Sequence, residues 1–246
     1  MALKAAPDVQ ARLLDLQALD TRLAQLDHRA KSLPELAAIA DLGTQAAALR
    51  VRLTEEQGVL ENTQLELGRV EADVAVVETR IQRDSERLQA SSSVKDVAAL
   101  EQELSALRKR LDDLEEIELA VMERAELQQA AVSTTEAELG AIAARTLEAE
   151  AARDAALAAL AADRASAAAD RGVIASALPE DLLALYEKQR SRYGTGASLL
   201  RGGVSLASGV KLLEDELQKI RAAAPDDVLI CPSSDAILVR TEESGL

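Results

Sequence analysis

The chain has 246 residues, with 43 Asp and Glu against 28 Lys and Arg and a formal net charge of −15 at pH 7. Its only aromatic residues are two tyrosines, which is too few for the core of an ordinary globular enzyme. The acidic balance argues against nonspecific binding to nucleic acid, and the single cysteine excludes an intrachain disulfide.

A first helix is predicted from about Pro7 to Lys31. Its apolar stripe consists of Leu13, Leu16, Leu19, Leu23 and Leu26. The segment Ser32-Leu-Pro-Glu35 then combines the serine and glutamate of a capping box with a proline that the first helical turn tolerates. We therefore expect a kink or break at residues 32–34 and a new helix after it.

Beyond this break, apolar residues recur at alternating spacings of three and four, which is the heptad pattern of a coiled coil. The ascending seam consists of Leu60, Thr63, Leu67, Val70, Val74, Val77, Ile81 and Leu88. The descending seam consists of Val97, Leu100, Leu104, Leu107, Leu111, Leu114 and Val121. The serines at 91–93 separate the two seams, so the pattern predicts an antiparallel hairpin with its tip near residues 90–96.

The two seams also predict a register for the hairpin. The expected partners are Ile81 with Leu104, Val74 with Leu111, Leu60 with Ala125 and, in the alanine-rich stretch that leads to about Asp170, Leu26 with Leu160. The apolar residues Leu65, Val76 and Ile117 lie beside the seam, where they would support a dimer or a partner helix. One such fringe is common in monomers, so we expect a monomer slightly more than a homodimer.

After residue 173 the heptad pattern ends, and a small domain is predicted over residues 174–246. It begins with an amphipathic helix from Leu178 to Arg190 and a glycine-rich connector, SRYGTGASLLRGG. A helical piece at about Lys211–Ala223 and two β-rich runs, Asp227–Cys231 and Ala236–Arg240, follow. The fold class is thus mostly α: a long coiled-coil hairpin over residues 1–173 with a small α+β domain.

The packing of the two β-rich runs is left open by the pattern. Their alternating apolar residues are Val228, Ile230, Ile237 and Val239. These residues would pack against the helix around Leu213 and Leu217, or against the base of the coiled coil near Leu183 and Tyr186.

Three segments resemble a known family. They are LLDLQALDTRL near the start, LPEDLLALYEKQR before the tail and the terminal AILVRTEESGL. They are similar to bacterial proteins, especially of an actinobacterial branch, that join a coiled-coil hairpin to a C4-type zinc ribbon. The resemblance covers essentially the whole chain and implies two Cys-x-x-Cys knuckles around one zinc ion.

In this chain the resemblance places the four ligand positions at Ser205, Ser208, Cys231 and Ser234. Three thiols are missing, and a serine hydroxyl is a poor zinc ligand near pH 7, so we expect a degenerate site without zinc or another cofactor. His28 is the only histidine and lies in the first helix, where we expect a solvated side chain. The knuckle glycines are replaced as well, by Ala207 and Asp235, which fits natural degeneration better than engineering.

The sequence favours a non-catalytic function. It contains no phosphate loop, nucleophile elbow or histidine-based dyad, so we assign no catalytic residue. The favoured function is an adaptor or scaffold, because a stiff acidic hairpin can present its tip and its terminal domain to different protein partners. The resemblance adds regulation of gene expression or assembly, since some members of that family in flagellated bacteria are linked to sigma factors, the secretion apparatus and flagellar gene expression. The alternative is a nucleic-acid-binding regulator, and its contacts would be Arg190, Arg192, Arg201, Lys211, Lys219, Arg221 and Arg240.

A cytoplasmic location is expected. The first apolar run is broken by Arg12, Asp15 and Asp20, unlike a signal peptide. No apolar run approaches the roughly 20 residues that a membrane-spanning helix needs. We therefore predict no membrane contact.

Overall fold

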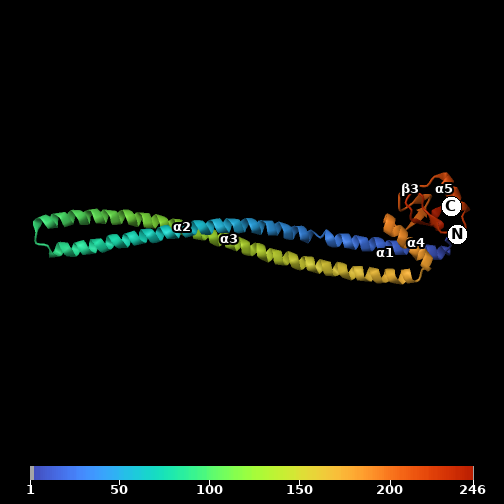
Figure 1. Ribbon diagram of the computed structural model, residues 1–246, viewed down its shortest axis with the longest axis horizontal. Helices are drawn as coiled ribbons and strands as arrows, with labels where there is room; N and C mark the ends of the chain where they lie inside the picture. The colour runs from blue at the N-terminus through green and yellow to red at the C-terminus, as the bar shows by residue number, and fades with distance from the viewer. Residues whose placement is uncertain (1–2, 246) are drawn as a thin grey trace. The chain divides into compact units, whose positions relative to one another are not determined.

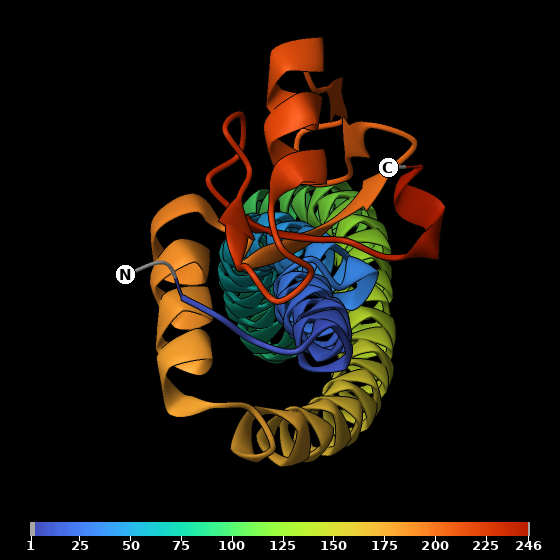
Figure 2. The same cartoon turned by 90° about the vertical axis from the view of Figure 1, so that its right-hand side faces the viewer.

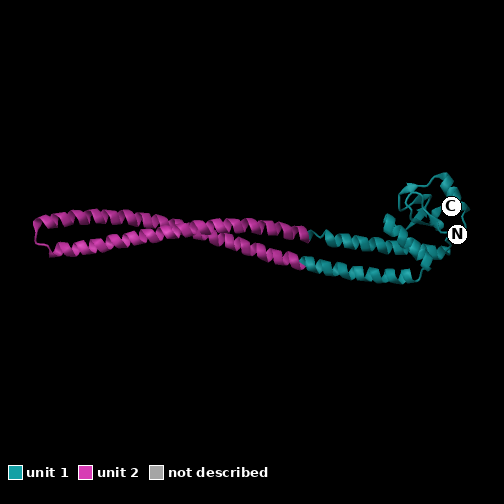
Figure 3. Ribbon diagram, viewed as in Figure 1, with its two compact units in different colours: residues 1–34, 152–246 teal, residues 35–151 magenta. Residues whose placement is uncertain are grey.

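The computed structural model describes residues 3–245 and divides into two compact units. Unit 1 comprises residues 1–34 and 152–246, and unit 2 comprises residues 35–151 (Figure 3). The chain is mostly helical with a small C-terminal sheet, which confirms the predicted fold class. Among the described residues, no helix is both long and apolar enough to cross a membrane.

Unit 2 is an antiparallel helical hairpin. It is built from α2 (Pro34–Ala90) and the first part of α3 (Val94–Ser176), which lie side by side in Figure 1. The turn between the helices falls at the predicted serines, and every predicted seam residue is buried or half-buried. The seam therefore stabilises the hairpin by burying one narrow apolar stripe along each helix.

Cross-helix pairs report the register of the hairpin. Near the tip, Arg80 pairs with Glu103, each one residue before the predicted partners Ile81 and Leu104. Further pairs join Glu66 with Arg124 (2.8 Å), Glu56 with the Thr135 hydroxyl (2.7 Å) and Arg52 with Glu138 (3.6 Å). All of these pairs lie within seven residues of the register that the two seams predict.

The seam contains one buried carboxylate that the apolar pattern did not predict. Asp84 occupies the heptad position after Ile81, and its side chain is only 1% exposed. Arg80, Arg83 and Arg87 approach its two oxygens at 3.7, 3.8 and 3.3 Å. Even so, Oδ2 accepts no hydrogen bond, so this layer of the coiled coil holds an incompletely satisfied charge.

The break before the hairpin occurs where the sequence predicts it, but the capping differs. Helix α1 (Pro7–Lys31) ends and α2 begins three residues later. The Ser32 hydroxyl donates to the carbonyl of His28 at 2.9 Å, so it closes the end of α1 instead of capping α2. Oε2 of Glu35 is buried without a hydrogen-bond partner. The predicted capping box is therefore wrong, because the preceding helix takes the serine side chain.

Unit 1 contains a five-stranded sheet in the order β3-β2-β1-β5-β4. The strands are β1 (Ala197–Arg201), β2 (Val204–Ser205), β3 (Val210–Lys211), β4 (Leu229–Ile230) and β5 (Ile237–Val239). The central strand β1 pairs in parallel with β5 and antiparallel with β2. The predicted glycine-rich connector is thus wrong in part, because its Ala-Ser-Leu-Leu-Arg stretch is the strand buried in the middle of the sheet.

Helices cover both faces of this sheet. On one face, Ile237 and Val239 pack with Leu13 and Leu16 of α1 and with residues of α4 (Glu180–Tyr193). On the other face, Leu238 packs with residues of α5 (Glu214–Ala222). Figure 2 shows α4 and α5 as separate short helices around the strands. The predicted packing near Leu183 and Tyr186 therefore occurs for Val228, Ile237 and Val239. The predicted packing of these residues against Leu213 and Leu217 is wrong, because alternate residues of a strand point to opposite faces and Leu238 is the one that meets Leu217.

The base of the coiled coil also belongs to unit 1, because α1 shares its core with the sheet. The predicted partners Leu26 and Leu160 are both buried in this unit. Beside them, Asp27 accepts a 2.8 Å hydrogen bond from Arg164. The predicted boundary at residue 173 marks the end of the heptad pattern, whereas the compact unit reaches back into α1 and α3.

Candidate functional site

A partly buried polar cluster joins three helices of unit 1. Asp20 of α1, with a side chain 3% exposed, accepts hydrogen bonds from Arg171 of α3 at 2.7 Å and from Arg190 of α4 at 2.6 Å. Glu187 pairs with both of these arginines. The phenol of Tyr186 donates to Asp20 at 2.7 Å. We call Asp20, Arg171, Tyr186, Glu187 and Arg190 the base cluster.

Two members of the base cluster, Tyr186 and Arg171, have a raised pKa. Burial and the hydrogen bond to Asp20 raise the pKa of Tyr186, so the phenol keeps its proton. The hydrogen bond to Asp20 likewise raises the pKa of Arg171. The carboxylates and guanidinium groups of the cluster are paired with one another. The cluster is therefore suited to holding helices in place and not to proton transfer.

Gln17 connects the base cluster to the sheet. Its Oε1 accepts from the backbone N–H of Gly196 at 2.7 Å and of Ala197 at 3.3 Å, and from the Tyr186 hydroxyl at 3.3 Å. A Cβ at residue 196 would lie 2.4 Å from the Tyr186 ring, so only glycine fits there. The start of β1 is thereby held against α1 and α4.

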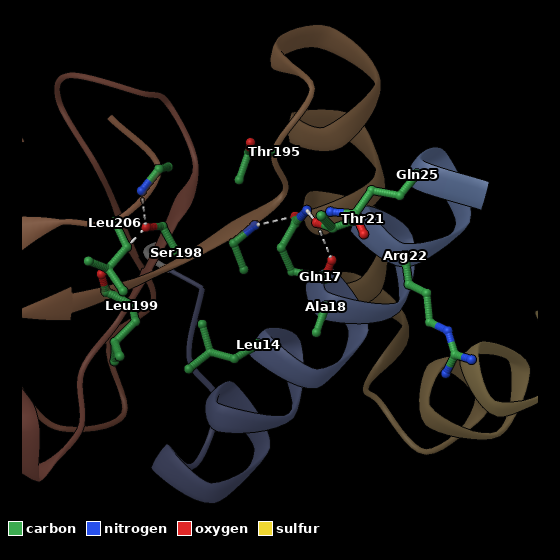
Figure 4. Close-up of a pocket in the computed structure, with 12 residues that line it drawn as sticks. Leu14, Gln17, Ala18, Thr21, Arg22, Gln25, Thr195, Ser198, Leu199 and Leu206 are labelled. Carbon is green, nitrogen blue, oxygen red and sulfur yellow. Dashed lines mark hydrogen bonds between the residues drawn. The ribbon is translucent and has the colours of Figure 1, made fainter. Parts of the chain in front are cut away.

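An open groove of ≈ 620 Å³ lies beside this contact, between α1 and the start of the sheet (Figure 4). Its lining is mostly apolar or uncharged: Leu14, Gln17, Ala18, Thr21, Gln25, Thr195, Ala197, Ser198, Leu199, Leu206 and Ala207, with Arg22 as the only charged side chain. Leu206 is 54% exposed at one wall. The groove therefore offers solvent an apolar surface with a few hydrogen-bonding groups, as binding sites do.

The four positions that the resemblance assigns to zinc ligands come together in unit 1. Ser205 and Cys231 are fully buried, and the Ser208 hydroxyl lies 3.0 Å from that of Ser233. Oγ of Ser234 is buried without a hydrogen-bond partner. Among residues 3–245, no group of three or more His, Cys, Asp or Glu is arranged to hold a metal ion. The predicted positions thus converge, but hydroxyls occupy most of the places where thiolates would be needed.

The Cys231 thiol lies at the centre of these hydroxyls. Burial opposes its ionisation, but hydrogen bonding by the Ser205 and Ser233 hydroxyls outweighs burial and lowers its pKa. Ser233 Oγ is 3.2 Å from the sulfur. Asp235 ends the same turn with a φ of 56°, the left-handed conformation that glycine adopts most readily. This turn therefore surrounds a single thiol with hydroxyl groups.

Most of the predicted nucleic-acid contacts already have partners within the chain. Arg190 belongs to the base cluster, Arg201 pairs with Glu243 at 3.1 Å, and Arg221 pairs with Glu214 at 2.8 Å. Arg240 donates to five backbone carbonyls, those of Ile220, Ala223, Ala224, Pro225 and Asp227. Arg192 lies 5.5 Å from the centre of the Tyr193 ring. Lys211 and Lys219 are exposed. The structure thus brings few free cations together.

Sequence reasoning missed Asp20 and Gln17 as structural residues. Asp20 lies four residues after Leu16, at a spacing that a core leucine would normally occupy. The available signal was a charged residue at a position where the helical spacing calls for an apolar one. Asp84 in α2 gives the same signal. His28 is exposed, as expected.

Comparison with known proteins gives matches over most of the chain. The family model of the CT398-like coiled coil hairpin domain matches residues 16–194. Rv2229c of Mycobacterium tuberculosis is 34% identical over 241 residues, which cover 98% of each chain. A Mycobacterium smegmatis structure is 35% identical with a TM-score of 0.85, covering 97% of this chain and 100% of the other. CT398 of Chlamydia trachomatis matches at 16% identity and a TM-score of 0.64 over 95% and 98% of the two chains, which supports the fold alone.

Proposed function

The chain belongs to the family of CT398-like coiled-coil hairpin proteins, and we propose that it is a non-catalytic adaptor that binds protein partners in the regulation of gene expression or in assembly. The charged residues of the base cluster support this proposal, because they neutralise one another and hold α1, α3 and α4 together. Such a cluster stabilises a scaffold. We further propose a cytoplasmic monomer.

The observation that carries the proposal is the groove between α1 and β1. It presents Leu14, Leu199 and the half-exposed Leu206 next to amide and hydroxyl groups. Protein partners commonly bind such surfaces by burying apolar side chains in the centre and making hydrogen bonds at the rim. Arg22 is the only charged side chain in the lining, so the groove suits a protein segment better than a phosphate-rich ligand.

Nucleic-acid binding receives less support. Phosphate recognition needs free Lys and Arg, whereas Arg190, Arg201 and Arg221 are paired with carboxylates and Arg240 holds backbone carbonyls. Mobility shifts with RNA and duplex DNA at low salt test this alternative directly. Binding that weakens steeply with salt would favour it over the adaptor.

We also propose that the C-terminal domain is a degenerate C4 zinc ribbon of the actinobacterial branch that needs no zinc. Two features support this: the ligand positions converge around Cys231, and the strands share two apolar cores with α1, α4 and α5. In small zinc domains, thiolate–zinc bonds take the place of an apolar core. Here the two apolar cores provide that stabilisation.

Site-specific photo-crosslinking in the native host tests the groove. A crosslinker at Leu206 is compared with one at Leu213, which is 70% exposed and does not line the groove. We expect a discrete protein adduct from position 206 that an Ala18→Arg change in the same chain abolishes. Adducts of equal yield from both positions, or none at 206, would contradict a protein site in the groove.

A further inference from the structure

Three arginines surround one buried carboxylate near the C-terminal end of α2. Arg80, Arg83 and Arg87 lie 3.7, 3.8 and 3.3 Å from Asp84, and the side chain of each arginine is more than half exposed. Arg80 has a second partner in Glu103 of α3. Arg83 and Arg87 share the single charge of Asp84, so positive charge remains unbalanced on this side of the hairpin.

The N–H groups of Arg83 and Arg87 are largely unused. A guanidinium carries five N–H donors. Among residues 3–245, Arg83 donates no hydrogen bond, and Arg87 donates one, to Asp84 at 3.3 Å. Asp84 thus draws both side chains to one side of α2 and leaves most of their exposed N–H groups to an acceptor from outside the chain.

An apolar side chain continues this surface along α2. Val76 is 67% exposed and lines an open hollow of ≈ 390 Å³, whose other lining residues are Ala75, Thr79, Arg80 and Arg83. Positions 76, 80, 83 and 87 are spaced by four, three and four, so they lie on one face of the helix. This face is about 16 Å long, which matches about three turns of a second helix.

The charge of this face selects the kind of occupant. The chain as a whole carries −15, so a face with unbalanced guanidinium groups differs from the acidic remainder. A carboxylate accepts charge-assisted hydrogen bonds from arginine, whereas a cationic partner would be repelled. A second copy of the chain fits poorly, because a two-fold interface uses the same patch twice and would bring arginines together.

A nucleic acid fits this face less well than an acidic protein segment. A phosphate backbone carries one negative charge at every nucleotide. The exposed Glu86 lies three residues after Arg83 and would repel such a ligand. Val76 and Ala75 in the hollow would have no apolar surface to pack against, whereas a protein helix can present carboxylates beside apolar side chains.

We propose that the arginine face, consisting of Val76, Arg80, Arg83 and Arg87, docks an acidic amphipathic helix of a protein partner. Asp or Glu side chains of that helix accept hydrogen bonds from Arg83 and Arg87, while its apolar side chains cover Val76. The sequence left Val76 to a dimer or to a partner helix, and the arginines beside it favour the partner helix. The inference rests on the proposed adaptor function only in that the partner is a protein.

Two synthetic helical peptides test the proposal with the full chain. Both carry the same leucine stripe, one with glutamates on its flanks and its twin with lysines. Fluorescence anisotropy at physiological ionic strength measures their dissociation constants. We expect saturable binding of the acidic peptide that weakens with added salt, no binding of its twin at this face, and crosslinks from a photoreactive leucine position to residues 75–87.

Two variants identify the groups responsible. Arg83→Gln removes a cation that donates no hydrogen bond within the described residues, and Val76→Ser removes the exposed apolar group. We expect Arg83→Gln to raise the dissociation constant at least fivefold and Val76→Ser at least threefold, each with an unchanged circular dichroism spectrum. Arg50→Gln, at an exposed arginine elsewhere on α2, is the matched control and should leave binding unchanged.

Absence of saturable binding by the acidic peptide, crosslinks that map elsewhere, or equal effects of Arg83→Gln and Arg50→Gln would overturn the proposal. Tight binding of a single-stranded RNA that Arg83→Gln weakens would assign the face to nucleic acid instead. Dimerisation that Val76→Ser abolishes would assign it to a second copy. Crosslinking from Leu206 in unit 1 tests the adaptor function separately, so the two failures are distinguishable.

Discussion

The Tyr186 hydroxyl donates a 2.7 Å hydrogen bond to the Asp20 carboxylate, although 166 residues separate them in the chain. Asp20 belongs to α1, which precedes the hairpin in the sequence, and Tyr186 belongs to α4, which follows it. Their contact closes unit 1 between segments that the whole hairpin separates. Loss of this contact should therefore lower the free energy of unfolding.

Asp20→Asn is expected to lower the free energy of unfolding by about 2–3 kcal/mol. Breaking a buried ion pair costs about 3–5 kcal/mol, and solvent lowers this here because Arg171 and Arg190 are 21% and 39% exposed. Urea denaturation followed by circular dichroism measures the change. In the control, Asp27→Asn, both partners of the lost pair are about half exposed, so the loss should stay below about 1 kcal/mol. Equal losses would show that Asp20 has no special role.

Stability should fall as pH rises above about 10, the ordinary pKa of a tyrosine. The folded chain raises the pKa of Tyr186, so it retains a phenol proton that the unfolded chain releases. The stabilisation is thus fully present below pH 10 and is lost progressively above it. In a Tyr193→Phe background, absorbance at 295 nm reports Tyr186 alone. Phenolate that appears near pH 10 while the circular dichroism remains native would refute the prediction.

Asp84→Leu should leave the hairpin equally stable or raise its free energy of unfolding by about 1–3 kcal/mol. It replaces a buried, incompletely satisfied carboxylate by a residue that the seam favours, and the arginines around it are more than half exposed and stay solvated. Thermal unfolding measures the effect. Asp112→Leu, on an exposed face, should change stability by no more than about 0.5 kcal/mol. A marked destabilisation by Asp84→Leu alone would mean that the ion cluster contributes net stability.

Restoring thiols at the positions that the resemblance assigns to zinc ligands should make the chain bind zinc. Changing Ser205, Ser208 and Ser234 together to Cys would complete four thiols with Cys231, and the engineered chain should bind one zinc ion and melt at a higher temperature unless a chelator is present. The unchanged chain should melt at the same temperature with and without the chelator. Stoichiometric zinc in the unchanged protein, measured by elemental analysis, would disprove the zinc-free proposal.

The sequence predicted the elements whose cause is local. Helix α1, the break after Lys31, the tip at residues 91–93 and both seams follow from the spacing of apolar residues and from local helix breakers, which act over a few residues, although the capping predicted at the break was wrong. The seams also predict an antiparallel hairpin, since two mirrored apolar stripes can bury themselves only by folding back.

Tertiary structure alone decided the features that depend on distant partners. Strand β1 looks like a glycine-rich connector until β5 pairs with it. Asp20 looks like a solvated helix charge until Arg171, Arg190 and Tyr186 surround it. Likewise, no local pattern reveals that Gln128 keeps an unpaired oxygen, because burial and hydrogen bonding depend on which side chains the fold brings within reach.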